Sequence, residues 1–190
     1  MEKKLIEKLI KKSIDGDERA FRELYDKYKG KIFKTAYLML RDEKGAEDIV
    51  QEVFITVYKK IYKLKYAEAF ESWLYKITIN RCNEYFRKNS KAVVTDEEDM
   101  YQIYDTDIYA QPDERLLTEE RNQQLDRKIN SLSEKLKTCI ILFYYNNMTI
   151  KQIADILGCS EGTVKSRLFK AKRAIEKKLN TELVKEGAYI

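Results

Sequence analysis

The sequence predicts an all-α protein made of two small helical domains joined by an acidic linker, with a helix-turn-helix in the second domain. Six glycines and one proline in 190 residues are too few for the turns of a β-sandwich or barrel. Apolar residues recur at helical spacing in both halves of the chain. We therefore expect domains over residues 1–90 and 119–190 and a linker over 91–118.

The charge distribution supports this division. Between Lys91 and Glu120 there are ten acidic and two basic residues, so this stretch carries −8 and the rest of the chain +13 of the formal net charge of +5. A basic body suits a polyanionic partner through phosphate contacts and counterion release. The simpler alternative is that net charge only aids solubility.

The first half begins with two expected helices. Asp17 is a candidate N-cap for a helix over residues 17–28. Gly30 interrupts the apolar pattern, and a separate helix over 32–40 would turn Tyr37 inward. These helices supply part of the core of the first domain.

A long third helix is expected over residues 46–64, where apolar residues recur from Ala46 to Ile61. Phe54 and Ile55 widen its apolar stripe beyond what one packing face requires. Two interpretations remain open: a surface that binds a partner, or simple tight packing.

A fourth helix is expected over residues 70–87, with Ser72 as a possible N-cap. Tyr75, Tyr85 and Phe86 alternate with basic and amide residues. Exposed rings beside cations bind single-stranded nucleic acid, because rings stack on bases while Lys and Arg contact phosphates. The equally supported alternative is a core helix whose aromatic residues are buried.

The linker contains the acidic run and the chain's one proline, Pro112. A flexible acidic tether is the default expectation. However, the linker also contains aliphatic and aromatic residues, among them Tyr101, Ile103 and Tyr109, so we expect part of it to pack against another surface.

In the second domain we expect helices over residues 120–129 and 134–145, and then the helix-turn-helix over 149–172. Thr149 and Ser160 are candidate N-caps, and Gly158 suits the left-handed position that ends the first helix of the motif. The last helix is expected to continue to about residue 179.

The outer face of this last helix is polar and basic, as a major-groove reader requires. The residues expected to contact DNA are Ser160, Glu161, Thr163, Lys165, Ser166, Arg167 and Lys170. The alternative is an ordinary helical hairpin with a solvated charged face.

Several other classes of protein are disfavoured. The chain has no histidine, no phosphate-binding loop and no GxSxG motif, so we expect neither an enzyme nor a cofactor. Its three cysteines are widely spaced and form no CxxC, which predicts reduced thiols and no metal site. We find no secretory signal and no apolar run of membrane-spanning length, so we expect a cytoplasmic protein without membrane insertion.

Five segments, in the family's order along the chain, resemble the extracytoplasmic-function (ECF) group of the bacterial sigma-70 family. The C-terminal motif is LGCSEGTVKSRLFKAKR (157–173), preceded by LSEKLKTCIILFYYNNMTIKQIA (132–154). In the first half, GDERAFRELYDKYKGKIFKTAY (16–37), AEDIVQEVFITVYKKI (46–61) and SWLYKITINRCNEYFRK (72–88) resemble the family's region 2. Departures from the family pattern are mild, such as Ser133 where proline is usual.

The resemblance implies a subunit that directs RNA polymerase to promoters and opens the DNA strands there. Asp48 and Gln51 match the family's DxxQ, on the helix that binds the core polymerase, and Glu52, Phe54 and Ile55 are expected to share that surface. The region that opens the strands and reads the minus-ten element matches residues 80–88. The contacts expected there are Asn80, Arg81, Tyr85, Arg87 and Lys88.

The resemblance further implies that the helix-turn-helix reads the minus-thirty-five element, and that the acidic linker enters the polymerase near its active centre. Many relatives are held by an anti-sigma factor. The sequence shows neither such a partner nor the promoter sequence, the regulon, the inducing signal or contacts to individual bases.

Two rival interpretations predict different behaviour. A conventional repressor or activator would be a dimer that binds a palindromic duplex without polymerase. A helical adaptor would bind only protein and show no salt-dependent affinity for DNA.

Overall fold

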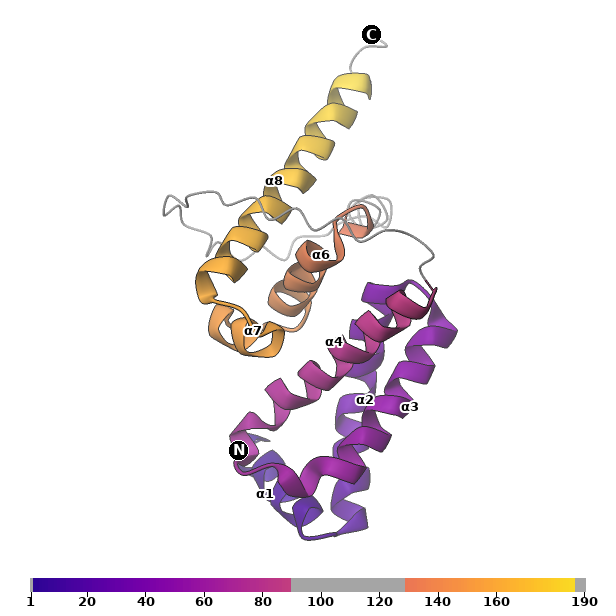
Figure 1. Ribbon diagram of the computed structural model, residues 1–190, viewed down its shortest axis with the longest axis vertical. Coiled ribbons are helices and arrows are strands. Elements are labelled where there is room, and N and C mark those ends of the chain that lie inside the picture. Colours follow the sequence, from indigo (N-terminus) through magenta and orange to yellow (C-terminus); the bar gives the residue numbers. More distant parts are fainter. Residues whose placement is uncertain (1, 90–128, 187–190) are drawn as a thin grey trace.

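The computed structural model describes the backbone of residues 2–89 and 129–186, with side chains for 4–89 and 129–176. The first lobe contains four helices: α1 (Glu2–Ile14), α2 (Glu18–Leu40), α3 (Glu43–Lys60) and α4 (Phe70–Asn89). Two short 3-10 turns, η1 (Ile61–Lys63) and η2 (Ala67–Ala69), connect α3 to α4. Helices α2, α3 and α4 pack together, and α1 lies against α2 (Figure 1).

The second lobe contains α6 (Glu134–Ile140), a π-helical turn η3 (Ile141–Tyr145), α7 (Ile150–Leu157) and the long α8 (Glu161–Glu186). Over the described parts of the chain the fold is helical and has no strand, as predicted. The expected linker over 91–118, its packing, and nearly all of the expected helix over 120–129 lie outside the described residues.

The predicted caps of three helices are confirmed. The Asp17 carboxylate accepts hydrogen bonds from the backbone N–H groups of Arg19 and Ala20, at 2.9 and 3.1 Å. Thr149 forms a reciprocal capping box with Gln152 at the start of α7. The Ser160 hydroxyl accepts a bond from the Thr163 N–H at 3.1 Å. These caps satisfy N–H groups that have no partner within the helix.

Two expectations for the first helices are wrong. Helix α2 runs without a break through Gly30, because the burial of Leu24, Ile32 and Ala36 outweighs the cost of about 1 kcal/mol for a glycine in a helix. This continuous helix turns Tyr37 outward, where it is 38% exposed and stacks on Phe33.

Other helix ends differ from the prediction. Helix α3 ends at Lys60 and tightens into η1, whereas we expected it to reach residue 64. Helix α4 begins at Phe70, so Ser72 lies inside its first turn and is no cap. The expected helix over 134–145 changes to π geometry at Ile141, where the Asn146 N–H reaches back five residues to the Ile141 carbonyl. Helix α8 continues beyond residue 179.

The two lobes are in contact. Helix α2 packs against α6 and η3, and α4 packs against α7 (Figure 1). None of the described helices is both long enough and apolar enough to cross a membrane.

A pair of glycine substitutions tests the backbone argument. Gly158 ends α7 at φ +65, so Gly158→Ala should destabilise the protein by about 1–2 kcal/mol, because an L-residue is strained there. Gly30→Ala is the matched control. It lies within α2 with open space around its Cβ position, and should stabilise the protein by about 0.5–1 kcal/mol. Urea unfolding measures both, and equal effects of the two changes would contradict this account.

Candidate nucleic-acid and polymerase interface

The helix-turn-helix is built on a buried seam between α7 and α8. Ile153 on α7 and Val164 and Ala171 on α8 are fully buried, and Leu168 is nearly so. Gly158, in the left-handed conformation, lets the chain turn tightly between the two helices. These residues determine which side of α8 packs inward. They therefore also determine which side of α8 stays exposed and can contact a partner.

That remaining side carries the seven residues predicted to read the duplex. Ser160 and Glu161, at the start of α8, are exposed, whereas the five residues further along are partly exposed: Thr163, Lys165, Ser166, Arg167 and Lys170. The Ser160 and Thr163 hydroxyls lie 2.9 Å apart. The Arg167 guanidinium lies 3.9 Å from the Cys159 sulfur in the preceding turn. A polar surface is thus available, and contacts to DNA stay a prediction.

The residues predicted to read the melted strand lie on the second half of α4. Asn80, Arg87 and Lys88 are exposed. Arg81 is partly buried and ion-paired with Glu84 at 2.7 Å, and its Nε lies 3.6 Å from the Glu52 carboxylate on α3. Arg81 therefore links the predicted DNA-reading helix to the predicted polymerase-binding helix.

Tyr85 is held by the corner between α2 and α3. Its hydroxyl donates a short hydrogen bond to the Asp42 carboxylate. This bond, followed by the N–H of Gly45, lowers the pKa of Asp42. The same bond, followed by burial, raises the pKa of Tyr85. A Cβ on Gly45 would lie within 3.0 Å of both side chains, so the close packing requires glycine there. The geometry favours a structural role for the Tyr85 hydroxyl.

The other aromatic residues of α4 also pack inward. Tyr75 is 2% exposed and its pKa is raised by burial, while Phe86 is partly buried against the core. For these rings the structure agrees with the alternative of a core helix. The pattern of rings beside cations along α4 did not by itself identify an exposed stacking surface.

An exposed aromatic surface lies elsewhere, and the sequence analysis missed it. Tyr58, Tyr62 and Tyr66 are 56%, 63% and 70% exposed along the end of α3 and the loop after it. Four exposed lysines alternate with them: Lys59, Lys60, Lys63 and Lys65. We call residues 58–66 the tyrosine–lysine surface. The segment YKKIYKLKY was the available signal, because it combines three rings with four cations and no acidic residue.

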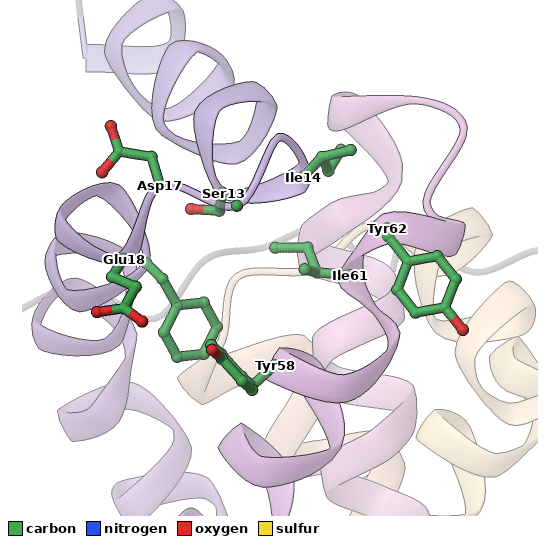
Figure 2. Close-up of a pocket in the computed structure, with 9 residues that line it drawn as sticks. Ser13, Ile14, Asp17, Glu18, Tyr58, Ile61 and Tyr62 are labelled. Carbon is green, nitrogen blue, oxygen red and sulfur yellow. The ribbon is translucent and has the colours of Figure 1, made fainter.

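A shallow pocket lies beside this surface. Tyr58, Ile61 and Tyr62 line one side of it, and Ser13, Asp17 and Glu18 at the α1–α2 corner line the other (Figure 2). Tyr58 packs edge-on against Phe21, with ring centroids 5.1 Å apart. This contact holds the Tyr58 ring against the first lobe. Exposed rings with lysines around them are suited to stacking on bases.

Four of the five residues predicted to bind the polymerase on α3 are exposed, and polymerase binding itself stays a prediction. Asp48, Gln51 and Glu52 are exposed, and Ile55 is 53% exposed. Phe54 requires a correction: it is only 5% exposed and packs edge-on against Tyr25 at 4.8 Å. Tight packing explains Phe54, so its side chain offers no docking surface in this structure.

Two of the three cysteines have thiols that resist ionisation. Cys82 and Cys139 are buried, and burial raises the pKa of their thiols to about 12 and about 11. Within the described ranges, no cluster of three or more His, Cys, Asp or Glu residues could hold a metal ion.

Comparisons with known proteins agree with this architecture. The Sigma-70 region 2 family model matches residues 24–92, and the Sigma-70 region 4 model matches residues 122–175. The chain is 32% identical to the ECF RNA polymerase sigma factor SigW of Bacillus subtilis over 185 residues, which cover 92% of this chain and 97% of that protein. It is 30% identical to the ECF RNA polymerase sigma-E factor of Escherichia coli, over 90% of this chain and 92% of the relative.

The chain belongs to the ECF group of the sigma-70 family. Members of this family are promoter-specific transcription initiation factors and are not enzymes. In this ECF factor the region 2 match includes α3, α4 and the tyrosine–lysine surface, and the region 4 match includes the start of α8.

Solved structures support the fold of this ECF factor. CnrH, solved in complex with the cytosolic domain of CnrY, superimposes with a TM-score of 0.70 at 18% identity, over 93% of this chain and 98% of that chain. The sigma factor RpoE of Bartonella quintana, solved with the anti-sigma factor NepR, gives a TM-score of 0.62 at 22% identity, over 84% of this chain and 96% of that chain.

The bond between Tyr85 and Asp42 predicts a pH-dependent effect. Asp42 has a lowered pKa in the folded protein, so its stabilising bond is present above the ordinary value of 3.8 and is lost as pH falls through the lowered value. Tyr85→Phe should therefore destabilise the protein near neutral pH and less so in acid. It should also raise the pKa of Asp42 toward 3.8, as measured by NMR titration of the carboxyl carbon. The exposed Tyr66→Phe is the control, and an unchanged Asp42 pKa in Tyr85→Phe would contradict the assignment.

Proposed function

We propose that this ECF sigma factor binds the core polymerase through α3, places α8 on the duplex of the minus-thirty-five element, and captures unpaired bases of the minus-ten element beside α4. It has no chemistry of its own and takes no cofactor. Because its partner enzyme transcribes in the cytoplasm, we place it there as well.

The geometry of the helix-turn-helix is the single observation that carries the proposal. Val164, Leu168 and Ala171 turn one side of α8 inward, so the polar and basic side faces outward. A helix that presents its first turns in this way can enter a major groove, where Arg pairs with guanine and hydroxyls contact bases or phosphates.

Strand capture is supported by the tyrosine–lysine surface together with α4. Unstacking costs a few kcal/mol per base, and stacking on a protein ring returns about 1–3 kcal/mol. Two or three bases held on exposed rings, with phosphates beside Lys63 and Lys65, offset much of the cost of a small bubble. We thus assign Tyr62 and Tyr66 to this role alongside the predicted Asn80, Arg87 and Lys88.

An anti-sigma factor is a further proposed partner. Two structural relatives were solved with proteins bound, CnrH with CnrY and RpoE with the anti-sigma factor NepR. A pull-down from cells that carry the gene, probed for small proteins and polymerase subunits, tests whether this chain has such a partner.

Run-off transcription with purified core polymerase tests the proposal as a whole. A cognate promoter should give a transcript only when this chain is present. Transcription that does not depend on the chain would overturn the proposal. Tight binding of a palindromic duplex by the chain alone would favour a conventional repressor or activator, and no DNA affinity even with polymerase would favour an adaptor.

Arg167→Ala tests the reading of the duplex. If Arg167 contacts a base edge, the change should weaken binding to the cognate element by about 1–3 kcal/mol and relax specificity at one position. Lys172→Ala is the control on the same helix, where exposed Lys172 lies 3.9 Å from Glu176, and its effect should be similar for all sequences. Promoter selection that is unchanged in Arg167→Ala would remove that residue from the reading role.

A double substitution on α3 tests polymerase binding. Asp48→Ala with Gln51→Ala should weaken assembly with the core polymerase while the circular dichroism and unfolding midpoint stay near those of the wild type, because both side chains are exposed. Arg22→Ala with Glu23→Ala on α2 is a matched exposed pair. Assembly of the α3 variant at wild-type affinity would show that α3 is not the docking helix.

A further inference from the structure

Arg167, which is predicted to read the duplex, lies at the border between the buried and the open side of α8. It comes three residues after Val164 and four before Ala171, so the three side chains are neighbours on the helix surface. Val164 and Ala171 are fully buried, whereas Arg167 is partly exposed. The Arg167 side chain can therefore contact the rest of its own lobe and a partner at the same time.

Two cysteine sulfurs lie next to the Arg167 guanidinium. Its Nη1 donates a hydrogen bond of 3.9 Å to Sγ of Cys159, in the turn between α7 and α8. The second sulfur belongs to Cys139 on α6. Burial raises the pKa of the Cys139 thiol to about 11, and the positive charge of the nearby Arg167 acts against this rise. The guanidinium thus joins α6, the turn and α8, which pack together in the second lobe (Figure 1).

Both sulfurs are held in place by the fold of the lobe. Cys139 is fully buried, on a helix that packs against α8. The Cys159 N–H donates to the carbonyl of Ala154 at 3.1 Å, and the next residue, Ser160, caps α8. Because the backbone is bonded on both sides of the Cys159 side chain, this side chain presents a fixed acceptor to Arg167.

The sulfur contacts leave the charge of Arg167 unneutralised. The raised pKa keeps the Cys139 thiol neutral near pH 7. A cysteine sulfur is only a weak hydrogen-bond acceptor. Within the part of the chain that the structure describes, no carboxylate pairs with Arg167. The positive charge therefore stays available to an acceptor on DNA.

Arg81, on α4, shows the opposite arrangement. Its guanidinium is ion-paired with Glu84 at 2.7 Å, and its Nε lies 3.6 Å from the carboxylate of Glu52. A DNA phosphate would have to compete with two negative charges for Arg81. At Arg167 it would compete only with sulfur atoms, which bind a guanidinium more weakly than a carboxylate does.

An arginine that is held before it binds loses less on binding. A long side chain loses rotamer entropy when it is immobilised at an interface, and this loss is smaller where the side chain already has one position. A guanidinium also has to point its N–H groups at the acceptors in a groove. Weak contacts that orient Arg167 therefore favour both affinity and selectivity.

We propose that Cys159 and Cys139 are positioning residues for Arg167, and that they orient its guanidinium for contact with the minus-thirty-five duplex. This inference rests on the proposed function, because that function assigns α8 to this element. The two thiols then act on recognition through Arg167 and need not touch DNA themselves.

The test removes and restores the sulfur contact in the complete chain bound to core polymerase. Cys159→Ala removes the acceptor, and Cys159→Ser keeps a weak acceptor in the same place. Cys139→Ala removes the buried thiol, and Cys82→Ala, which removes an equally buried thiol on α4, is its matched control. Circular dichroism and thermal unfolding verify that each variant is folded.

Affinity for a duplex is the first readout. The probe is a duplex that the wild-type holoenzyme selects from a random-sequence pool, used at low temperature so that its strands stay paired. Cys159→Ala and Cys139→Ala should each weaken binding about threefold to tenfold, whereas Cys159→Ser and Cys82→Ala should stay near the wild type. Wild-type affinity in the folded Cys159→Ala and Cys139→Ala proteins would overturn the inference.

A thermodynamic cycle separates positioning from a general loss of structure. In the Arg167→Ala background, the addition of Cys159→Ala should change duplex affinity by less than about twofold, because no guanidinium is left to orient. An equal loss with and without Arg167 would show that the cysteine only supports the fold.

The Arg167 Nε–H resonance gives a readout that does not depend on DNA. In the isotope-labelled full chain, Cys159→Ala should move this resonance toward its position in an unfolded peptide, and Cys159→Ser should return it toward the wild-type position. An identical resonance in all three proteins would show that the sulfur does not hold the guanidinium. If the wild-type holoenzyme selects no duplex, the proposed function fails and the role in DNA contact fails with it, while this resonance still shows whether Cys159 holds Arg167.

Discussion

The burial of α2 is the constraint on which both lobes depend. Leu24, Tyr28, Ile32, Ala36 and Met39 are all 3% exposed or less, and they follow one side of the helix over four turns. At about 25 cal/mol per Å² of apolar surface, this stripe is a large stabilising contribution to the first lobe. Because α3 and α4 pack on the same helix, it also sets the position of the docking face and of the minus-ten residues.

The same helix positions the second lobe. Its C-terminal turn presents the Met39 carbonyl to Lys137, and Thr35, one turn earlier, faces Asn146. If the chain had broken at Gly30 into two helices, as the sequence suggested, Thr35 and Met39 would not continue the axis set by the buried residues before Gly30. The unbroken helix is therefore a requirement for the interlobe contact, as well as for the core.

Local signals in the sequence predicted much of the fold, and tertiary burial decided the rest. Thr149, Gly158 and Ser160 were identified correctly because capping depends on a few neighbouring residues. Gly30 and Tyr37 were interpreted wrongly because burial against other helices outweighs the preference of a single residue. The contact between the lobes was not predicted at all, since it joins residues about 100 positions apart.

The candidate site shows the same division. The helical period correctly predicted that Asp48 and Gln51 are exposed. It did not predict which aromatic residues are exposed and which are buried. Tyr75 is flanked in the sequence by polar and basic residues, as an exposed stacking ring would be, yet it lies in the core. Tyr62, in the short turn η1, is exposed. Periodicity separates the faces of a long helix, but it cannot say how many faces are covered when the helix has neighbours on two sides.

The hydrogen bonds between the two lobes give a contact of modest free energy. A hydrogen bond contributes about 0.5–1.5 kcal/mol net, so the bonds of Lys137, Thr35 and Tyr75 together give a few kcal/mol. The unsatisfied Asn146 Nδ2 and the desolvated Lys137 subtract from that sum. A partner that binds with nanomolar affinity supplies about 12 kcal/mol, which is larger than the net contribution of these bonds.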